Sequence, residues 1–374
     1  MDVEASSHGG PPVLLRAWAE CPYRASLAGG GSDLPYFYQQ HGGAVVSAAL
    51  DAKVKVTVRP ASDGVTVVEN GKTHRAVDIA SLDDVFLRGA LALSGVCGPL
   101  HMEILHGVST GAGLGSSGAQ SVAMMAALRA GAGLACEAHT LAEAACELEI
   151  DQLQRPVGKQ DPYGVAFGGL KRISIARDGA VSVRPLDSGG AVARMLDNHV
   201  LLFDSGTRRS AATVLREVRD IPPERRDATL CQLRDQALRL AELLDTGIDA
   251  PKLGRILDRG WMLKASISAS ISLKVLDGWY TSARQAGAFG GRVLGAGGGG
   301  FLLLVASPER HDAIRESLGH PPELRFAISP TGLRVMTDPS GRVQRSAPAI
   351  GVSQTERPLG CLETRQVKRP LGDH

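Results

Sequence analysis

A glycine-rich turn with two serines, Gly111-Ala-Gly-Leu-Gly-Ser-Ser117, carries the residue types best suited to chemistry in this chain. It follows an apolar, strand-like segment at 100–108 and precedes a helical pattern of small residues at 120–129. Backbone N–H groups in a turn that enters a helix bind phosphate, because the donors converge and the helix dipole favours negative charge. Ser116 or Ser117 would then be placed to ligate Mg²⁺ beside the phosphates. The alternative is that both serines only cap the helix, and the turn by itself leaves the two interpretations open.

The same turn also fits a nucleotide fingerprint, which we interpret as coincidental. Residues 113–118 satisfy the pattern G-x-G-x-x-G of dinucleotide-binding folds. Such folds continue with a second strand and an acidic residue about 20 positions on, whereas the next predicted element here is a helix at 139–153. The P-loop pattern G-x-x-x-x-G-K-[ST] does not occur in the sequence. We therefore predict a phosphate-binding site that belongs neither to a dinucleotide-binding fold nor to a P-loop.

Two carboxylates after the turn are candidates for metal binding and catalysis. Glu149 falls in the last turn of the predicted helix at 139–153, where a negative charge opposes the helix dipole. A nearby cation would offset that cost. Asp161 follows in a loop with flanking glycine and proline. The alternative for Glu149 is a solvated helix face, which is our interpretation of Glu147 and Asp151.

Two further glycine-rich segments flank the turn along the chain. They are Arg24-Ala-Ser-Leu-Ala-Gly-Gly-Gly-Ser-Asp33 and Leu294-Gly-Ala-Gly-Gly-Gly-Gly-Phe301. With Gly111–Ser117 between them, they resemble in the same order the three motifs of the GHMP kinase superfamily, and the resemblance covers about residues 13–335. It departs from the usual pattern at Ser109-Thr110, where the family has proline, and at Gly118, where it often has a third serine. Both departures leave the serine pair intact.

The resemblance implies a role for each motif. ATP would be bound by Gly111, Gly113, Leu114, Gly115, Ser116 and Ser117, and Mg²⁺ would be held by Ser116 and Glu149. Asp161 would be the catalytic carboxylate, with Arg24 stabilising charge near the transferred phosphoryl group. The sugar substrate would be bound by Asp33, Gly30, Gly31, Arg209, Gly297, Gly298 and Gly299.

Within the superfamily, the chain resembles the D-glycero-α-D-manno-heptose 7-phosphate kinases. The matching segments are GGGSDLPYFYQQHGGAVVS, GKQDPYGVAFGG, LLFDSGTRRSA and GWMLKASIS. The resemblance implies transfer of the γ-phosphoryl group of ATP to O1 of the heptose 7-phosphate, which gives the 1,7-bisphosphate on the way to a nucleotide-activated heptose. The alternatives are another sugar 1-kinase, of the fucose or galactose type, and a non-catalytic sugar sensor on the same fold. A decarboxylase of the diphosphomevalonate type would have no use for a sugar-binding Asp33.

A basic pair at 208–209 is the candidate site for the substrate's own phosphate. Arg208 and Arg209 follow a predicted strand at 200–206 and precede a helical pattern. Positive side chains at a helix N-terminus oppose the dipole, so they need an anion or an acidic neighbour. The resemblance favours Arg209, with Lys171 and Arg172 as possible helpers. The alternative is a solvated basic helix start.

Composition limits the class of protein. The chain has 374 residues, a formal net charge of +2 and no basic stripe with interleaved aromatic residues, so nucleic acid is not an expected partner. No apolar run approaches the roughly 20 residues of a membrane span, and the N-terminus lacks a signal-peptide pattern. Six scattered cysteines predict reduced thiols, and the histidines have no metal-ligand spacing. We expect a cytoplasmic protein; the sequence does not indicate its oligomeric state.

The chain is long enough for about two domains, and the resemblance implies that they form an α+β protein. Strands are expected at 44–50, 53–60 and 200–206, a hairpin around Asp178-Gly179, and helices within 210–245 and 250–287. Thr140 and Glu143 are predicted to form a capping box for the helix at 139–153. The resemblance implies the GHMP kinase fold: a ribosomal-S5-domain-2-like α/β domain at 12–190 and a ferredoxin-like α+β domain at 195–345. Residues 1–11 and 346–374 are expected to be disordered tails.

Overall fold

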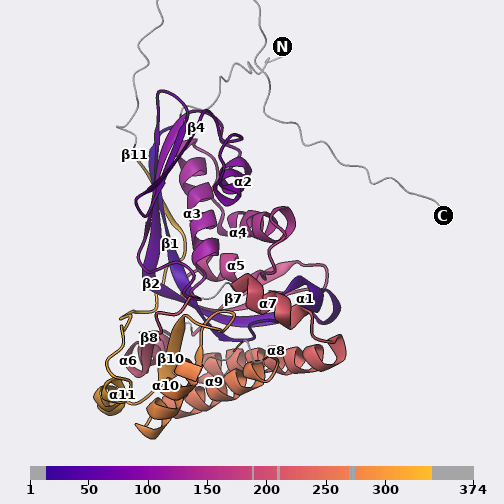
Figure 1. The fold of residues 1–374 in the computed structure, drawn as a ribbon, viewed down its shortest axis with the longest axis vertical. Coiled ribbons are helices and arrows are strands. Elements are labelled where there is room, and N and C mark those ends of the chain that lie inside the picture. Colours follow the sequence, from indigo (N-terminus) through magenta and orange to yellow (C-terminus); the bar gives the residue numbers. More distant parts are fainter. Residues whose placement is uncertain (1–13, 188, 209–210, 269–270, 272–273, 339–374) are drawn as a thin grey trace, which may run out of the picture.

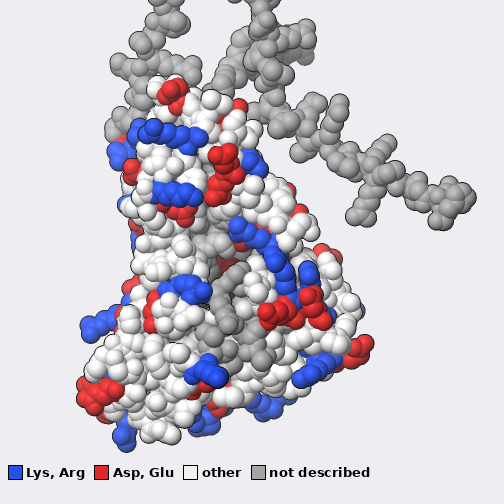
Figure 2. All heavy atoms as spheres, in the orientation of Figure 1, with Lys and Arg blue, Asp and Glu red and all other residues white. Residues whose placement is uncertain are grey.

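A computed structural model describes residues 14–338, apart from 188, 209–210, 269–270 and 272–273. Two sheets with helices packed on them form an upper and a lower part in the view of Figure 1. One sheet has eight strands and the other has three. The predicted α+β class is therefore confirmed. On the face shown in Figure 2, neither sign of charge gathers into one large patch among the described residues.

The larger sheet is organised around one long strand, β2 (Gly43–Pro60). Residues 43–48 of this strand pair with β6, residues 54–60 pair with β5, and most of its length pairs with β1. The strands predicted at 44–50 and 53–60 are thus one continuous element. The other members of this sheet are β1 (Arg16–Ala28), β3 (Val65–Glu69), β4 (Lys72–Ala76), β5 (Leu100–His106), β6 (Leu170–Ile175), β7 (Val181–Leu186) and β11 (Arg334–Asp338). The predicted hairpin is confirmed as β6 and β7.

Four helices lie along one side of this sheet in Figure 1: α2 (Val85–Leu93), α3 (Ser116–Gly131), α4 (Ala138–Cys146) and α5 (Gln160–Ala166). The central helix, α3, is buried at nearly every position and packs on β1 and β2. A helix that is buried all round must be apolar or small all round, and the run of alanines in α3 meets that need. The glycine turn therefore leads into an element that the core holds on every side.

The predicted helix at 139–153 differs from the expectation in two ways. It consists of α4 followed by a π-helical turn, η1 (Glu147–Gln152). The N-cap is Glu137, without a side-chain capping bond, so the capping box predicted for Thr140 and Glu143 is wrong. Glu143 instead accepts hydrogen bonds from the Lys159 ammonium and from a tyrosine hydroxyl. Tertiary partners thus outcompete the local cap.

The smaller sheet contains β8 (Val200–Asp204), β9 (Gly290–Val293) and β10 (Phe301–Val305), in the antiparallel order β8-β10-β9. Glu323 adds an isolated bridge to Phe203 on the outer side of β8. The resulting order, with the last segment beside the first strand, is that of the predicted ferredoxin-like arrangement. The helices of this part of the chain are α6 (Ala191–His199), α7 (Ala211–Arg219), α8 (Pro223–Thr246), α9 (Ala250–Ala265), α10 (Lys274–Gln285) and α11 (His311–Ser317), and a short helix η3 (Pro308–Arg310) precedes α11. Of these, α9 packs on β9 and β10, whereas α8 packs on α9 and on β1 and β2 of the larger sheet. The helical patterns at 210–245 and 250–287 are therefore divided into four helices.

The end of the described chain returns to the larger sheet. The strand β11 pairs with β1, from Arg16 opposite Asp338 to Glu20 opposite Arg334. These residues fall inside the range 195–345 that the sequence assigns to the second domain, so that range includes one strand of the first domain's sheet. The tails expected at 1–11 and 346–374 lie outside the described residues. Among the described helices, none is long and apolar enough to span a membrane.

Candidate functional site

Two glycine loops touch backbone to backbone at the site. The first glycine loop is the Gly111–Ser117 turn, and the second is the Leu294–Phe301 segment. Gly113 has a φ of +80°, and a Cβ there would lie 2.5 Å from the carbonyl oxygen of Leu294. Gly295 faces it, because a Cβ on Gly295 would lie 2.7 Å from the Gly113 Cα. A direct hydrogen bond also joins the loops, from the Phe301 amide to the Ala112 carbonyl oxygen at 3.3 Å. The glycines in both loops are therefore required by this contact as well as by any ligand.

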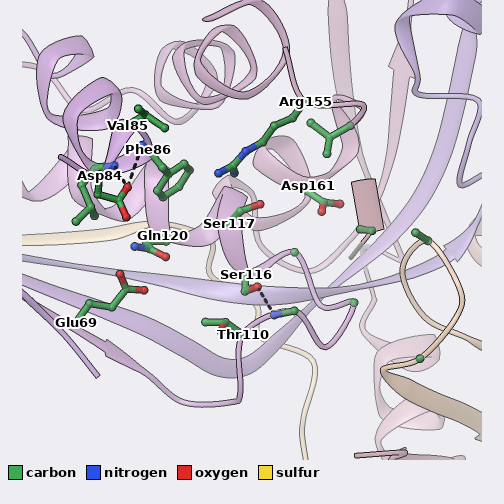
Figure 3. A pocket seen from close by; sticks show the side chains of 18 of the residues that line it. Glu69, Asp84, Val85, Phe86, Thr110, Ser116, Ser117, Gln120, Arg155 and Asp161 are labelled. Atoms are coloured by element: carbon green, nitrogen blue, oxygen red, sulfur yellow. Dashed lines mark hydrogen bonds between the residues drawn. The ribbon is translucent and has the colours of Figure 1, made fainter. Parts of the chain in front are cut away.

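A pocket of about 700 Å³ opens beside the first glycine loop (Figure 3). Gly111, Gly113, Gly115, Ser116 and Ser117 line it, as the sequence predicts for a phosphate site. Its far wall comes from the start of α2 and from β3, through Asp84, Val85, Phe86 and Glu69. Sequence reasoning missed this wall, because none of its residues belongs to a glycine motif.

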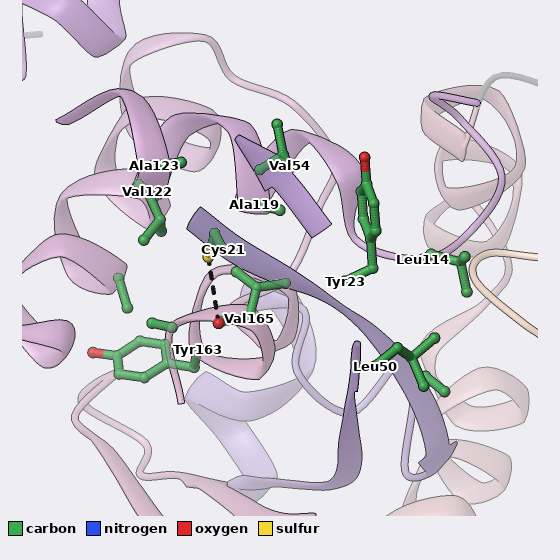
Figure 4. Packing of buried hydrophobic residues seen from close by; sticks show 14 of the residues in the cluster. Cys21, Tyr23, Leu50, Val54, Leu114, Ala119, Val122, Ala123, Tyr163 and Val165 are labelled. Carbon is green, nitrogen blue, oxygen red and sulfur yellow. Dashed lines mark hydrogen bonds between the residues drawn. The ribbon is translucent and has the colours of Figure 1, made fainter. Parts of the chain in front are cut away.

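The serines of the turn do not cap the following helix. The N-cap of α3 is Gly115, in the left-handed region, and no side chain caps it. The Ser116 hydroxyl instead accepts a hydrogen bond from the Gly111 amide at 3.2 Å, which closes the loop on itself. Leu114, predicted to bind ATP, does not line the pocket; its side chain is buried in the core (Figure 4), and its carbonyl oxygen accepts from the Arg24 amide. Leu114 therefore anchors the loop from behind.

Glu149 lies buried in the π-helical turn, with 3 % of its surface exposed. Burial raises the pKa of its carboxyl, and the nearby Asp161 carboxylate acts in the same direction. Arg155 opposes this shift and lies 3.2 Å away as an ion pair, and a hydrogen bond to Ser117 also lowers the pKa. The cation that the sequence required near Glu149 is thus Arg155, which no motif had indicated. Ser117, rather than Ser116, is the serine paired with Glu149.

Asp161 is held by Arg24 across the two elements that carry them, α5 and β1. The Arg24 Nε and Nη2 atoms lie 2.9 and 2.5 Å from Asp161 Oδ1, and Nη1 donates to the Gly113 carbonyl oxygen at 2.6 Å. Arg24 is 2 % exposed, whereas the Asp161 side chain is 31 % exposed. The buried arginine therefore fixes the carboxylate against the glycine loop and leaves it open to ligands.

A second, smaller pocket of about 100 Å³ lies on the other side of Asp161. Gly30, Gly31 and Asp33 line it, as predicted for the sugar site, together with Arg24. Asp33 is 2 % exposed and accepts hydrogen bonds from the Gly31 amide at 2.9 Å and the Gln160 amide at 3.3 Å. Burial raises the pKa of this carboxyl, and the hydrogen bond from Gly31 counteracts the shift. Asp161 and Gly113 line both pockets, so the two spaces meet at these residues.

The remaining predicted residues are placed less centrally. Gly297 and Gly299 line the larger pocket, not the smaller one, and Gly298 lines neither. Arg209 lies outside the described residues, while Arg208 forms a two-point ion pair with Asp204. In the described part of the chain, no group of three or more His, Cys, Asp or Glu side chains could hold a metal ion. A metal bound at Ser117 and Glu149 would therefore need ligand oxygens from a bound substrate.

Comparisons with known proteins agree with this arrangement. Residues 83–169 match the model of the GHMP kinases N terminal domain, and residues 240–322 match that of the GHMP kinases C terminal domain. The chain is 25 % identical over 324 residues to a D-glycero-alpha-D-manno-heptose 7-phosphate kinase of Campylobacter jejuni, covering 82 % of this chain and 95 % of that protein.

Solved structures share the fold at lower identity. A D-glycero-D-manno-heptose 1-phosphate kinase of Bacteroides thetaiotaomicron superposes with a TM-score of 0.70 at 21 % identity, over 86 % of this chain and 99 % of that one. A galactokinase of Lactococcus lactis, complexed with galactose, gives a TM-score of 0.70 at 16 % identity, over 85 % and 95 % of the two chains.

The contact between the glycine loops predicts that Gly113→Ala destabilises the protein by at least about 2 kcal/mol, because the left-handed φ and the clash with Leu294 both oppose a Cβ. Chemical or thermal unfolding measures the effect. Gly278→Ala is the matched control, since Gly278 lies in α10 with open space around its Cβ position, and there alanine should be neutral or stabilise by about 0.5–1 kcal/mol. Equal unfolding midpoints for the two variants would contradict the importance of the contact.

Proposed function

Because this chain belongs to the GHMP kinases, we propose that it is an ATP-dependent sugar 1-kinase whose acceptor already carries a phosphate. The observation that carries the proposal is the position of Asp161. This carboxylate lies where a pocket lined by the Gly111–Ser117 turn meets a pocket lined by Asp33. A donor and an acceptor bound in the two pockets would therefore meet at Asp161.

Phosphoryl transfer asks little covalent chemistry of the protein, and mainly positioning and charge stabilisation. ATP would lie in the larger pocket with its phosphates on the backbone amides of Gly111–Ser117. The acceptor hydroxyl oxygen forms a bond to the γ-phosphorus as the bond from that phosphorus to the β–γ bridging oxygen breaks. Asp161 accepts the hydroxyl proton, and Arg24 holds Asp161 in place and stabilises the negative charge of the moving group.

The residues present fit a Mg²⁺ ion at the turn. Glu149 is a buried carboxylate that accepts a hydrogen bond from Ser117, and hard oxygen donors of this kind suit Mg²⁺, which binds few protein ligands and takes the rest from phosphates and water. Glu149 would hold the ion together with Ser117, or with Ser116 as the sequence predicts. When bound, the ion neutralises phosphate charge.

The proposed acceptor is D-glycero-α-D-manno-heptose 7-phosphate, phosphorylated at O1 to the 1,7-bisphosphate. Support comes from the Campylobacter jejuni relative, whose name specifies a heptose 7-phosphate kinase. Gly30 and Gly31 leave the wall of the sugar pocket without side chains, which suits a larger sugar. Asp33 would accept hydrogen bonds from sugar hydroxyls. Arg209 would bind the 7-phosphate; Ala211, two positions later, lines both pockets.

The acceptor is tested by ATP depletion over sugars and sugar phosphates, with mass detection of the products. We expect heptose 7-phosphate to be preferred over free heptose, fucose and galactose by at least about 10-fold, as a charge-assisted contact to phosphate would give. Arg209→Ala should raise KM for the phosphorylated acceptor by roughly 10- to 150-fold and barely change KM for ATP. Equally efficient use of free fucose or galactose would instead identify a sugar kinase of that type.

Replacement of Asp161 tests the catalytic assignment. Asp161→Asn preserves shape but removes the charge and the basic oxygen, so kcat should fall by about 10²–10⁴-fold while ATP still binds. Calorimetry measures the binding and a coupled assay measures kcat. The control is Asp151→Asn, at an exposed carboxylate of the π-helical turn. An Asp161→Asn enzyme within a few-fold of the parent would refute the assignment.

Replacement of Glu149 tests the metal ligand. Glu149→Gln should raise the Mg²⁺ concentration needed for half-maximal rate by about 10-fold or more, because a neutral amide is a weaker ligand for a hard cation than a carboxylate. Glu147→Gln, two positions away on the exposed side of the same turn, should leave that concentration unchanged. The same Mg²⁺ requirement in both variants would show that Glu149 is not a ligand.

A further inference from the structure

A buried lysine with no role in the steps above lines the smaller pocket. Lys264, in the last turn of α9, is 7 % exposed and shares this pocket with Arg24, Asp33 and Asp161. It therefore belongs to the second domain's helices but contributes a cation to the acceptor side of the site. No glycine motif includes it.

The position of Lys264 is set by one hydrogen bond to the second glycine loop. Its Nζ atom donates to the Gly295 carbonyl oxygen at 2.6 Å. Gly295 is the residue that packs on Gly113, and Gly113 lines both pockets. Lys264 is thus linked through Gly295 to Gly113, where the two pockets meet. An ammonium group has three donors, and Gly295 is the one hydrogen-bond partner that the described residues provide.

The charges around Lys264 leave a surplus of positive charge. The charged groups that face it are Arg24 from β1, Arg292 from β9, Asp161 from α5 and Asp33 from the loop before α1 (Pro35–His41). With Lys264 itself, the described residues therefore place three cations against two carboxylates. Arg292 is 1 % exposed, lies behind Gly30, and its Nε has no partner among the described residues. Burying unbalanced charge is costly, so this wall of the pocket is suited to an incoming anion.

Lys159 and Lys171, the other buried lysines among the described residues, show that burial alone does not mark a site. Lys171 is 1 % exposed and donates to the Gly164 carbonyl oxygen at 2.7 Å, but it lines neither pocket. Burial lowers the pKa of the Lys171 ammonium to about 7, and the groups that act on it are Cys21, which lies in the apolar core shown in Figure 4, and Arg24. Lys171 is therefore a structural lysine, not the substrate-phosphate helper that the sequence suggested, and it serves as a control.

We propose that Lys264 is a second catalytic cation beside Arg24, and that it donates hydrogen bonds to the non-bridging oxygens of the phosphoryl group during its transfer. The inference rests on the proposed kinase function. The bonds made and broken are those given above, and Lys264 keeps its proton throughout. Removal of one preorganised hydrogen-bond donor that stabilises the charge developing in a transition state lowers kcat by about 10²–10³-fold.

The protonation of Lys264 gives the proposal a distinctive signature. Burial lowers the pKa of the Lys264 ammonium to about 7, with Arg292 and Arg24 acting in the same direction and Asp33 and Asp161 opposing it. Because the charged form is the active one, activity is present below that pH and is lost as the pH rises through it. The quantity that reports the free enzyme is kcat/KM, and it should decline above about pH 7. An arginine at 264 stays charged throughout this range.

The experiment compares Lys264→Met, Lys264→Arg and Lys171→Met, with kcat/KM measured from pH 6 to 9. Lys264→Met should lose about 10²–10³-fold in kcat while calorimetry shows ATP bound within a few-fold of the parent. Lys264→Arg should recover much of the rate and lose the decline above about pH 7. Lys171→Met should keep the parent's kcat and pH profile. If Lys264→Met does not fold, the pH profile of Lys264→Arg by itself tests whether Lys264 is the catalytic cation.

The proposal would be overturned by a Lys264→Met enzyme within threefold of the parent kcat, or by an unchanged decline with pH in Lys264→Arg. ADP release in the absence of any sugar is measured in parallel, because transfer of the phosphoryl group to water needs the same charge stabilisation. If no sugar acts as acceptor, the acceptor proposal fails. A loss of this basal ADP release in Lys264→Met would then still support the cation, and an equal rate would refute it.

Discussion

The contact between two glycine loops is the constraint on which the rest of this structure depends. Gly113 and Gly295 come from the turn before α3 and the loop after β9, and each occupies the space where a side chain of the other would stand. Because the two backbones are in direct contact, residues attached to both sheets are brought together beside these loops. Asp161 and Arg24 come from the first part of the chain and Lys264 from the second, yet all three line the pocket beside this contact. A wider separation of the loops would divide the site into unrelated halves.

Buried charges are the second organising feature, and they are arranged in partly balanced groups. Arg24 is neutralised by Asp161 and Glu149 by Arg155, through ion pairs of 2.5 and 3.2 Å. Asp33 depends on amide donors instead, and burial raises the pKa of its carboxyl. Pairs and amides of this kind hold charge in a low-dielectric setting at a cost in stability. Perturbed groups gathered beside a cleft are typical of functional sites, and here they surround the point where the two pockets meet.

Local sequence patterns predicted most elements correctly and failed where distant contacts decide. The hairpin at β6 and β7, the strand β8 and the small-residue helix α3 follow from periodicity and turn residues. The capping box at Thr140 and Glu143 was wrong because Lys159 and Tyr163 bind Glu143. The π-helical turn, the continuity of β2 and the return of β11 to β1 leave no local pattern, since each depends on partners far along the chain.

By itself, the sequence predicted the glycine turns and most of the strands and helices, because residue type and short spacing encode these features, while the resemblance of its motifs to a family supplied the α+β class and the roles expected of the carboxylates. The motifs were sufficient to place Asp161 and Arg24 in one site, and the structure confirms their contact. Only the tertiary structure decided that Ser116 closes its own loop while Ser117 pairs with Glu149. It also decided that Arg155 is the cation that balances the charge of Glu149, and that Lys264 lines the smaller pocket. The physical reason is that hydrogen bonds and desolvation act through space, between side chains brought together by packing of the two sheets and their helices, and no spacing along the chain records them.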